Sequence, residues 1–268
     1  MKPKQLKKLL LSEIKLVSEN VNEYCFSEGK DFTRKRKLSF ETVIKTLMGM
    51  ESKSLSNELI TAFDTEPEMP STSAFVQQRY KIKPEAFKAV FDGFTSRLIN
   101  NTSTELRIFA IDGSDIQIAT NPNDATSYFP GTNGQKPYNL LHLNALYDLN
   151  NHIYTDAIIQ GGMDKNEHIA LQEMVDNSDI LKALVIADRG YESFNSMAHI
   201  QEKGWFFLIR VKDGINGIKN GLDLPATDCF DADICLKLTR KQTNEVKELL
   251  KDKNHYRFIS ATQPFDYL

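Results

Sequence analysis

Two short apolar runs that each end at an aspartate constrain the fold of this chain more than any other feature. One occupies residues 106–111 and stops at Asp112, the other occupies residues 182–187 and stops at Asp188, and a glycine follows each aspartate within two residues. Apolar runs of this length, bounded by turn signals, are typical of buried strands. A carboxylate at the C-terminal end of such a strand lies where open α/β sheets place their ligands. We therefore expect the two carboxylates to lie side by side at one edge of a sheet.

The chain around these two runs predicts an α/β domain over residues 105–212. Alternating apolar residues predict strands, and apolar residues at helical spacing predict helices. After the strand of Asp112, the predicted elements are a long loop at 121–139, a hairpin of strands at 141–148 and 152–159, a helix at 166–175, the strand of Asp188, a helix at 194–203 and a fully buried strand at 205–211. The order is therefore strand, strand, strand, helix, strand, helix, strand.

The segments on either side of this domain differ from it. Residues 1–104 show helical spacing of apolar residues, with a proline-containing break at 66–70 and a polar linker at 100–104. Short helices followed by a longer one are compatible with a helix-turn-helix bundle, although any small helical domain has this pattern. Residues 213–268 begin with glycines and a proline and continue with β-rich runs. We expect three parts with boundaries at 1–104, 105–212 and 213–268.

The net charge of −3 conceals an uneven distribution. Residues 1–60 carry 12 basic and 8 acidic side chains, whereas residues 111–233 carry 8 basic and 18 acidic ones. A basic head and an acidic middle suit a nucleic-acid-binding protein whose central site holds cations, although surface charge also varies without function. One predicted helix is preceded by four consecutive bases, Arg34, Lys35, Arg36 and Lys37. These bases either contact phosphates or form a solvated face.

Composition excludes several classes of protein. Apolar residues make up 41% of the chain and charged residues 26%, as in soluble globular proteins. No apolar run approaches the roughly 18 residues that span a bilayer, and the basic N-terminus lacks the longer apolar run and cleavage site of a signal peptide. Cys25, Cys229 and Cys235 are too scattered for a disulfide framework or a zinc site. We expect a cytoplasmic protein with no membrane partner.

The paired aspartates indicate a chemistry. An aspartate before a glycine often merely begins a turn, which would explain either residue alone, but two in matching strand positions favour a shared site. Carboxylates held together repel each other unless a cation lies between them. Oxygen ligands favour Mg²⁺ or Mn²⁺ over zinc, and two such ions about 3.5–4 Å apart align phosphoryl transfer. Asp112 and Asp188 are therefore the predicted metal ligands and catalytic residues.

The motifs resemble those of a known family. Residues 187–191, Ala-Asp-Arg-Gly-Tyr, look like the second-aspartate motif of the insertion-sequence-four family of DDE transposases, and residues 111–114, Ile-Asp-Gly-Ser, look like its first. Residues 142–148 resemble the second strand of that family, and residues 33–40 and 73–79 resemble its N-terminal helical region. The resemblance implies a ribonuclease-H-like mixed-sheet catalytic core, preceded by an all-helical DNA-binding domain and followed by the start of a β-rich insertion.

The same resemblance implies an activity, cofactors and partners. The activity is cut-and-paste transposition, in which a site with two Mg²⁺ or Mn²⁺ ions cleaves and joins double-stranded DNA at terminal inverted repeats and at the target. A homodimer is expected in the active complex, on the nucleoid of a bacterial cytoplasm. Arg79 and Arg189 are expected DNA contacts in addition to the four consecutive bases. For Arg189, an ion pair with a neighbouring acid is an equally good expectation. We expect His142, His152 and His199 to be packed or surface histidines rather than ligands, and we expect Trp205 to lie in the core.

One feature of the family is missing from the sequence. Its third acid is a glutamate on a later helix beyond the β-rich insertion, and Glu245 and Glu248 come too early and lack the surrounding pattern. We therefore expect a transposase truncated before its catalytic glutamate, with little cleavage activity, an exposed flank and a tendency to aggregate. If the chain does cleave DNA, Glu167, Glu192 and Glu245 become the candidates. A non-catalytic DNA-binding or inhibitory remnant is the alternative, and the helical region argues against a third possibility, another metal nuclease of this fold.

Overall fold

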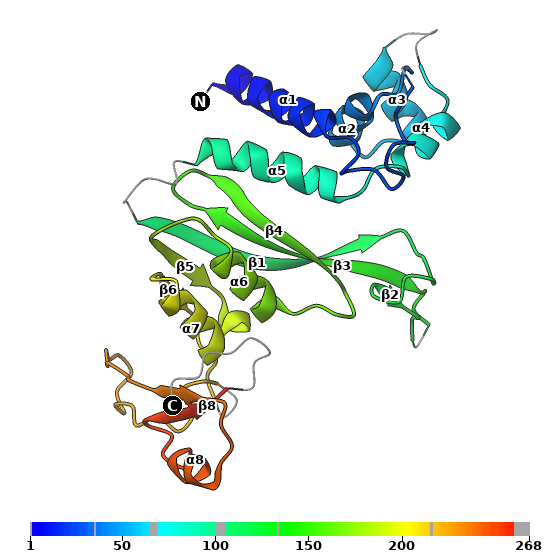
Figure 1. Ribbon diagram of the computed structural model, residues 1–268. Coiled ribbons are helices and arrows are strands. Elements are labelled where there is room, and N and C mark those ends of the chain that lie inside the picture. Colours follow the sequence, from blue (N-terminus) through cyan, green and yellow to red (C-terminus); the bar gives the residue numbers. More distant parts are fainter. Residues whose placement is uncertain are drawn as a thin grey trace. The chain divides into compact units, whose positions relative to one another are not determined.

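The computed structural model describes residues 2–34, 36–64, 69–99, 106–132, 134–214 and 217–259. Its contacts divide the chain into two compact units, Met1–Ile99 and Asn100–Leu268, and each is described by itself (Figure 1). The predicted linker at 100–104 lies outside the described residues, as does most of the predicted break at 66–70.

The first unit is built from helices with polar caps. They are α1 (Pro3–Glu19), α2 (Phe40–Met48), α3 (Leu55–Phe63), α4 (Thr72–Arg79) and α5 (Glu85–Leu98). The side chains of Ser39, Ser54 and Ser71 each accept a backbone N–H in the first turn of α2, α3 and α4. Each cap satisfies a donor that the helix leaves unpaired, which stabilises the helix by about 1 kcal/mol. The serines thus fix where three short helices begin.

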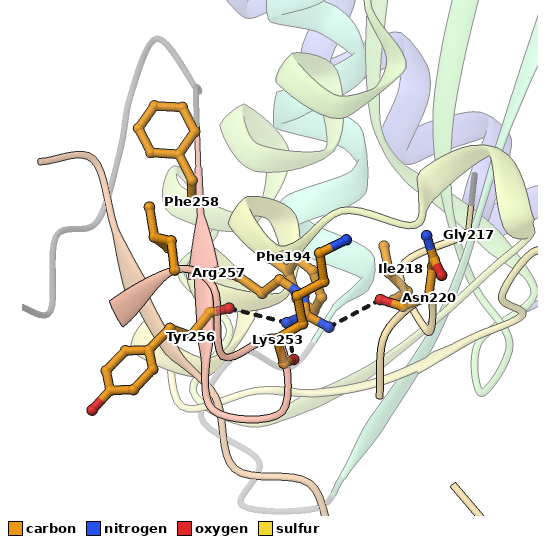
Figure 2. Close-up of a pocket in the computed structure, with 9 residues that line it drawn as sticks. Phe194, Gly217, Ile218, Asn220, Lys253, Tyr256, Arg257 and Phe258 are labelled. Atoms are coloured by element: carbon orange, nitrogen blue, oxygen red, sulfur yellow. Dashed lines mark hydrogen bonds between the residues drawn. The ribbon is translucent and has the colours of Figure 1, made fainter. Parts of the chain in front are cut away.

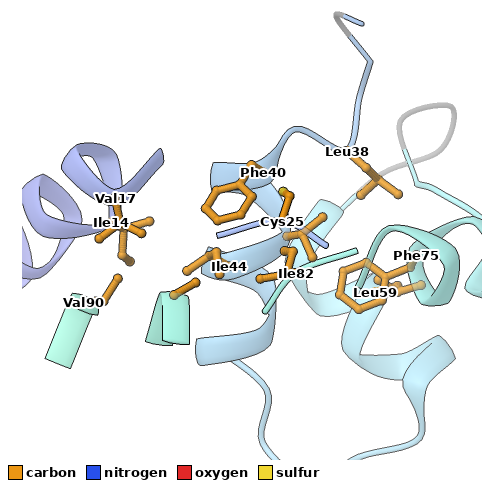
Figure 3. Packing of buried hydrophobic residues seen from close by; sticks show 12 residues of the cluster. Ile14, Val17, Cys25, Leu38, Phe40, Ile44, Leu59, Phe75, Ile82 and Val90 are labelled. Atoms are coloured by element: carbon orange, nitrogen blue, oxygen red, sulfur yellow. The ribbon is translucent and has the colours of Figure 1, made fainter. Parts of the chain in front are cut away.

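An apolar core joins these helices. The buried side chains meet at the centre of the unit, as Figure 3 shows for Phe40 and Ile44 of α2, Leu59 of α3 and Phe75 of α4. Ile44, Leu59 and Phe75 have no exposed surface. Burying such side chains stabilises the fold by roughly 1.5–3 kcal/mol each, so helices too short to be stable alone hold together as one unit.

The second unit is organised by a mixed sheet. Its strands are β1 (Arg107–Ile118), β2 (Tyr128–Phe129), β3 (Tyr138–Asp148), β4 (Ile153–Gly161), β5 (Ala183–Ala187) and β6 (Phe206–Ile209). The strand order is β2-β3-β1-β5-β6, with β4 also paired to β3. β1 runs antiparallel to β3 and parallel to β5. The predicted neighbourhood of the two aspartate-bearing strands is therefore confirmed. The predicted long loop at 121–139 contains the short strand β2, and β3 begins before its predicted end, at Tyr138.

Two helices cover one face of this sheet. α6 (Glu167–Asp176) contacts β3 and β4, and α7 (Phe194–Glu202) contacts β6 (Figure 1). Beneath the helices, Phe109 of β1 and Val185 of β5 are almost completely buried. Trp205 also lies in the core, where its indole N–H donates to the backbone oxygen of Ile180. The other face is less protected, because Leu184 and Ile186 on that side are only partly buried.

The prediction of a fully buried strand at 205–211 is wrong. The strand is shorter, Phe206–Ile209, and Phe206 and Leu208 are 54% and 61% exposed. β6 ends the sheet order, so it has one paired neighbour, β5. Its alternate side chains point to the face opposite α7, where they remain accessible within the described part of the chain. An apolar run alone therefore did not distinguish an edge strand from a central one.

The β-rich segment at the C-terminal side is a small structure of its own. β7 (Lys237–Thr239) pairs in parallel with β8 (Tyr256–Phe258), and α8 (Asn244–Leu249) connects them. Glu245 and Glu248 lie on α8. Figure 2 shows Arg257 of β8 lying against Phe194 of α7, with ring and guanidinium 5.6 Å apart. Arg257 also donates to the backbone oxygens of Lys253, Tyr256 and Asn220. One side chain therefore ties the small structure to the sheet domain.

Changing Arg257 to alanine is expected to loosen the β7–β8 structure. The substitution removes a cation–π contact and leaves carbonyl oxygens without a donor, which together cost on the order of 2 kcal/mol. Limited proteolysis of the full chain should then cut sooner between residues 217 and 259. Lys251→Ala is the control, because the Lys251 side chain pairs with Glu248 at the surface, a kind of pair worth little. Equal protection of both variants would contradict the anchoring role.

Candidate functional site

The register of the sheet sets the two predicted aspartates at the same level. The last registered pair between β1 and β5 is Ala110 with Ile186. Asp112 stands two residues further along β1, and Asp188 follows Ile186 by two residues with its backbone still extended, so both side chains are set toward the same face. β5 ends at Ala187, so Asp188 lies just past the strand end. Both aspartates are exposed.

Asp188 is held in its ionised form by its surroundings. Its carboxylate accepts the backbone N–H of Arg189 and lies 2.7 Å from Nη2 of Arg210, just after β6. The Arg189 N–H and the Arg210 guanidinium hold the pKa of the Asp188 carboxyl below its ordinary value. Sequence reasoning offered Arg189 as a partner for a neighbouring acid. The structure instead gives the ion pair to Arg210, while the Arg189 residue is exposed.

A second set of polar side chains lies on the α6 side of the same strands. His142 of β3 is 2% exposed and lies between two carboxylates. Its Nδ1 is 2.6 Å from Oδ1 of Asp115, and its Nε2 is 3.2 Å from Oε1 of Glu167. Lys165 pairs with the other oxygen of Asp115 at 3.1 Å. The side chain of Asn166 caps α6 by accepting the N–H of Ile169, so Glu167 is fixed in the first turn of that helix.

The glycines of the two aspartate motifs make room for Glu167. A Cβ on Gly113 would lie 2.6 Å from Nε2 of His142 and 2.8 Å from Oε1 of Glu167. A Cβ on Gly190 would lie 3.3 Å from the other carboxylate oxygen of Glu167. The Glu167 carboxylate therefore rests against the backbone next to Asp112 and two residues after Asp188. Gly113, the glycine that directly follows Asp112, therefore allows Glu167 and His142 to approach the backbone closely and does not form a turn.

Two buried polar atoms in this region have no hydrogen-bond partner among the described residues. They are Nε2 of His142, whose contact with Glu167 lacks hydrogen-bond alignment, and the hydroxyl of Tyr191, a residue 2% exposed. Burial, and then the charges of Glu167 and Asp112, raise the pKa of the Tyr191 hydroxyl, so Tyr191 is a neutral donor at physiological pH. Buried polar atoms are usually paired, and exceptions mark places where a water or an ion completes the site.

This donor set fits a hydrated divalent cation with a preference for oxygen. Asp112, Asp188 and Glu167 offer carboxylate oxygens, the ligands that Mg²⁺ and Mn²⁺ prefer. Mg²⁺ keeps several waters when it binds to protein, and the Tyr191 hydroxyl and the His142 nitrogen are buried polar atoms of the kind that pair with such waters. Across the described ranges, however, no group of three or more His, Cys, Asp or Glu side chains already has metal-binding geometry.

Sequence reasoning named Glu167 only as a fallback candidate for the third acid, did not single out Asp115 or Arg210, and expected His142 to be a packed or surface residue. Asp115 and His142 are register partners on β1 and β3, a pairing that sequence alone does not reveal. The other two histidines behave as expected. His199 is buried with its Nδ1 2.8 Å from Asp176, and His152 lies in the turn between β3 and β4.

The predicted DNA-contacting bases divide into two groups. Arg34 and Arg36 line a polar pocket of about 320 Å³ together with Lys30 and Lys81. Lys37 and Arg79 are not part of its lining, and Arg79 instead lies 5.3 Å from the ring centre of Tyr80. Lys35 lies outside the described residues. The structure thus adds Lys30 and Lys81 to the basic run and separates it from Arg79.

Comparison with known proteins gives one family. The family described as the transposase DDE domain has a model that matches residues 103–263, a range that contains both aspartates and the β7–β8 structure. A comparison with curated proteins finds no match. In the described residues, no helix is both long enough and apolar enough to cross a membrane.

Proposed function

The chain belongs to the transposase DDE domain family, and from this premise we propose that it is a DNA transposase that cleaves and joins strands at terminal inverted repeats by a cut-and-paste route. The observation that supports the proposal is the parallel pairing of β1 with β5, which brings the strand of Asp112 beside the strand that leads to Asp188. Within the family, the motifs at residues 111–114 and 187–191 support an insertion-sequence-four member. The mixed α/β sheet domain of this chain is compatible with a ribonuclease-H-like core.

The side chains of the site bind and orient the reacting groups. Asp112 and Asp188 are the proposed ligands of two Mg²⁺ or Mn²⁺ ions, which when bound activate an attacking hydroxyl and stabilise a leaving oxygen of DNA. The lowered pKa of Asp188 keeps its carboxylate charged and ready to bind a cation. Arg210 fixes the orientation of that carboxylate. Arg189 is exposed beside Asp188, where its guanidinium can contact a DNA phosphate.

The proposed partner is double-stranded DNA, bound by the helical unit as well as by the sheet domain. The pocket of Lys30, Arg34, Arg36 and Lys81 presents several cations at one place, as a backbone phosphate requires. We further propose that the active complex is a homodimer acting on chromosomal DNA in a bacterial cytoplasm, with residues 213–268 belonging to a β-rich insertion of the family.

The function is tested with DNA that carries the two boundaries of the mobile element surrounding the gene. The full-length gene product, Mn²⁺ and this DNA should give strand breaks at the boundaries, mapped by primer extension. Breaks at random positions at the same rate would instead indicate a general metal nuclease. Boundary binding without breaks would indicate the non-catalytic, inhibitory alternative, and either outcome would contradict the proposal.

Removing two bases from the pocket in the helical unit is expected to reduce the salt dependence of DNA binding. Each phosphate contact contributes about 0.9 to the slope of log K against log salt, so Arg34→Ala with Arg36→Ala should lower the slope by roughly 2. Fluorescence anisotropy of the full chain from 50 to 200 mM salt measures the slope. The control removes two exposed lysines of α1, Lys7→Ala with Lys8→Ala. An equal loss of slope in both double variants would assign the effect to net charge alone.

A further inference from the structure

We propose that the basic pocket of the helical unit is a site for a phosphomonoester, the phosphate group found at the end of a DNA strand and on a free mononucleotide. The pocket is the one lined by Lys30, Arg34, Arg36 and Lys81. This inference rests on the proposed function, because it specifies which phosphate the pocket takes. It concerns the first compact unit alone.

The first argument is the surplus of positive charge around the pocket. Lys30 and the two arginines come from the segment between α1 and α2, and Lys81 follows α4. Among the described residues, one carboxylate pairs with these cations, that of Asp31, at 3.7 Å from Nζ of Lys81. Four cations and one carboxylate leave a surplus of three positive charges. Like charges held together repel each other, so a ligand with more than one negative charge is favoured.

A phosphomonoester offsets this surplus better than an internal phosphate of DNA. It carries roughly 1.5 to 2 negative charges at neutral pH and has three free oxygens, whereas a phosphate inside a strand carries about one charge. The guanidinium groups of Arg34 and Arg36 offer forked pairs of N–H donors that match phosphate oxygens. An internal phosphate also continues into a nucleoside on both sides, which suits a groove along the surface. Here the cations instead surround a single volume of about 320 Å³.

The second argument is that the pocket is shaped before a ligand arrives. Phe32, which also lines it, has a φ of 55°, a left-handed conformation that is uncommon for a bulky side chain. Such residues persist only where their surroundings hold them, and they cluster at ligand clamps. The ring of Phe32 packs edge-on against Phe40 with centres 5.5 Å apart, and Nζ of Lys81 lies 5.8 Å from its centre. The pocket therefore orders few groups on binding, which favours affinity.

The size and the apolar side of the pocket limit the ligand to about one nucleotide. Its volume of about 320 Å³ is near the lower end of small-molecule sites. Leu38 lines the pocket, is 7% exposed and belongs to the apolar core drawn in Figure 3. Together with the half-buried Phe32 it gives an apolar wall for a sugar or a base, and the amide of Gln78 adds a polar group.

Calorimetric titration of the full chain with thymidine 5′-monophosphate tests the inference. The control ligand is the methyl ester of the same nucleotide, which has nearly the same size but is a singly charged phosphodiester. Near pH 7.5 the monophosphate should bind about tenfold more tightly. Near pH 5.5 this preference should shrink, because a phosphomonoester takes up its second proton at a pH of about 6. All five histidines lie at residue 142 or beyond, so no histidine of the helical unit produces that change.

A matched pair of variants assigns the binding to this pocket. Arg36→Gln should weaken binding of the monophosphate about tenfold and remove most of its advantage over the methyl ester. Lys8→Gln removes one charge from an exposed position on α1 and should leave the affinity within about twofold. Equal affinities of the two variants would overturn the assignment. Arg36 is exposed, and the comparison of the two ligands on the wild-type chain needs no variant.

Anisotropy binding of two otherwise identical duplexes separates the sources of the phosphate. Tighter binding of the duplex with 5′-phosphates than of the one with 5′-hydroxyls identifies the end of a DNA strand as the ligand. Equal binding of the duplexes, with the monophosphate still preferred over its ester, identifies a free nucleotide.

The outcomes also separate this inference from the proposed function. If the wild-type chain binds the monophosphate no better than its methyl ester near pH 7.5, the phosphomonoester site is wrong. Strand breaks at the element boundaries would in that case still support the transposase. If the preference for the monophosphate is present and boundary breaks are absent, the proposed function is wrong while the pocket stands.

Discussion

Asp188→Asn is expected to abolish metal-dependent strand cleavage at the element boundaries while leaving DNA binding unchanged. Asparagine preserves the shape of the side chain but removes the negative charge that holds a cation. Losing one ligand of a catalytic ion removes several kcal/mol of transition-state stabilisation, a fall in rate on the order of 10³-fold. The measurement compares single-turnover cleavage of boundary DNA with anisotropy binding of the same duplex, both with the full-length gene product.

The control for this experiment is a matched aspartate away from the site. Asp179 is exposed and precedes β5, so it lies near the opposite end of the strand that leads to Asp188. Asp179→Asn removes the same charge from the same strand region and should keep the wild-type cleavage rate. If both variants lose activity equally, net charge rather than a metal ligand at Asp188 explains the loss. If Asp188→Asn keeps its activity, Asp188 has no role in holding the ion.

Gly113→Ala is expected to destabilise the sheet domain by about 1–3 kcal/mol and to weaken Mn²⁺ binding at the same time. The new methyl group would be 2.6 Å from His142 Nε2 and 2.8 Å from Glu167 Oε1, so either the histidine or the glutamate must move. Urea denaturation measures the first effect and Mn²⁺ titration the second. Ser114→Ala changes the exposed neighbouring residue and should do neither.

A double-mutant cycle identifies the cause of this destabilisation. Truncating the histidine in His142→Ala removes the atom that the new methyl group would strike. Adding Gly113→Ala to that background should then cost clearly less than in the wild type, giving a coupling energy of at least 0.5 kcal/mol. Additive costs would show that the close approach around Gly113 does not control the stability of this region.

The sequence predicted the sheet better than the site. The apolar runs ending in Asp112 and Asp188 predicted two strands, and the strand order of the fold that the motifs resemble predicted that they are neighbours, as β1 and β5 are. The contacts of Glu167 and His142 were not predictable in the same way. They depend on the register between β1 and β3 and on where α6 begins above them. The choice of Arg210 over Arg189 as partner of Asp188 likewise depends on the pairing of β5 with β6.

The exposure of β6 was missed for a related reason. Residues 205–211 read as a continuous apolar run, and such a run says nothing of how many neighbours the strand will have. Position in the sheet, which is a property of the whole domain, decides that Phe206 and Leu208 are exposed.

The parallel pairing of β1 with β5 also governs when the protein can act during its own synthesis. Asp112 and Asp188 are separated by 76 positions along the chain, from 112 to 188, and the intervening residues form β3, β4 and α6. Contacts between such distant residues form late, because the loop that joins them must lose its conformational freedom first. A nascent chain that extends past Asp112 therefore lacks the second aspartate until residue 188 has been added. The two aspartates of the proposed site come together only when the sheet closes, so on that proposal a chain that ends before β5 lacks the pair needed to cut DNA.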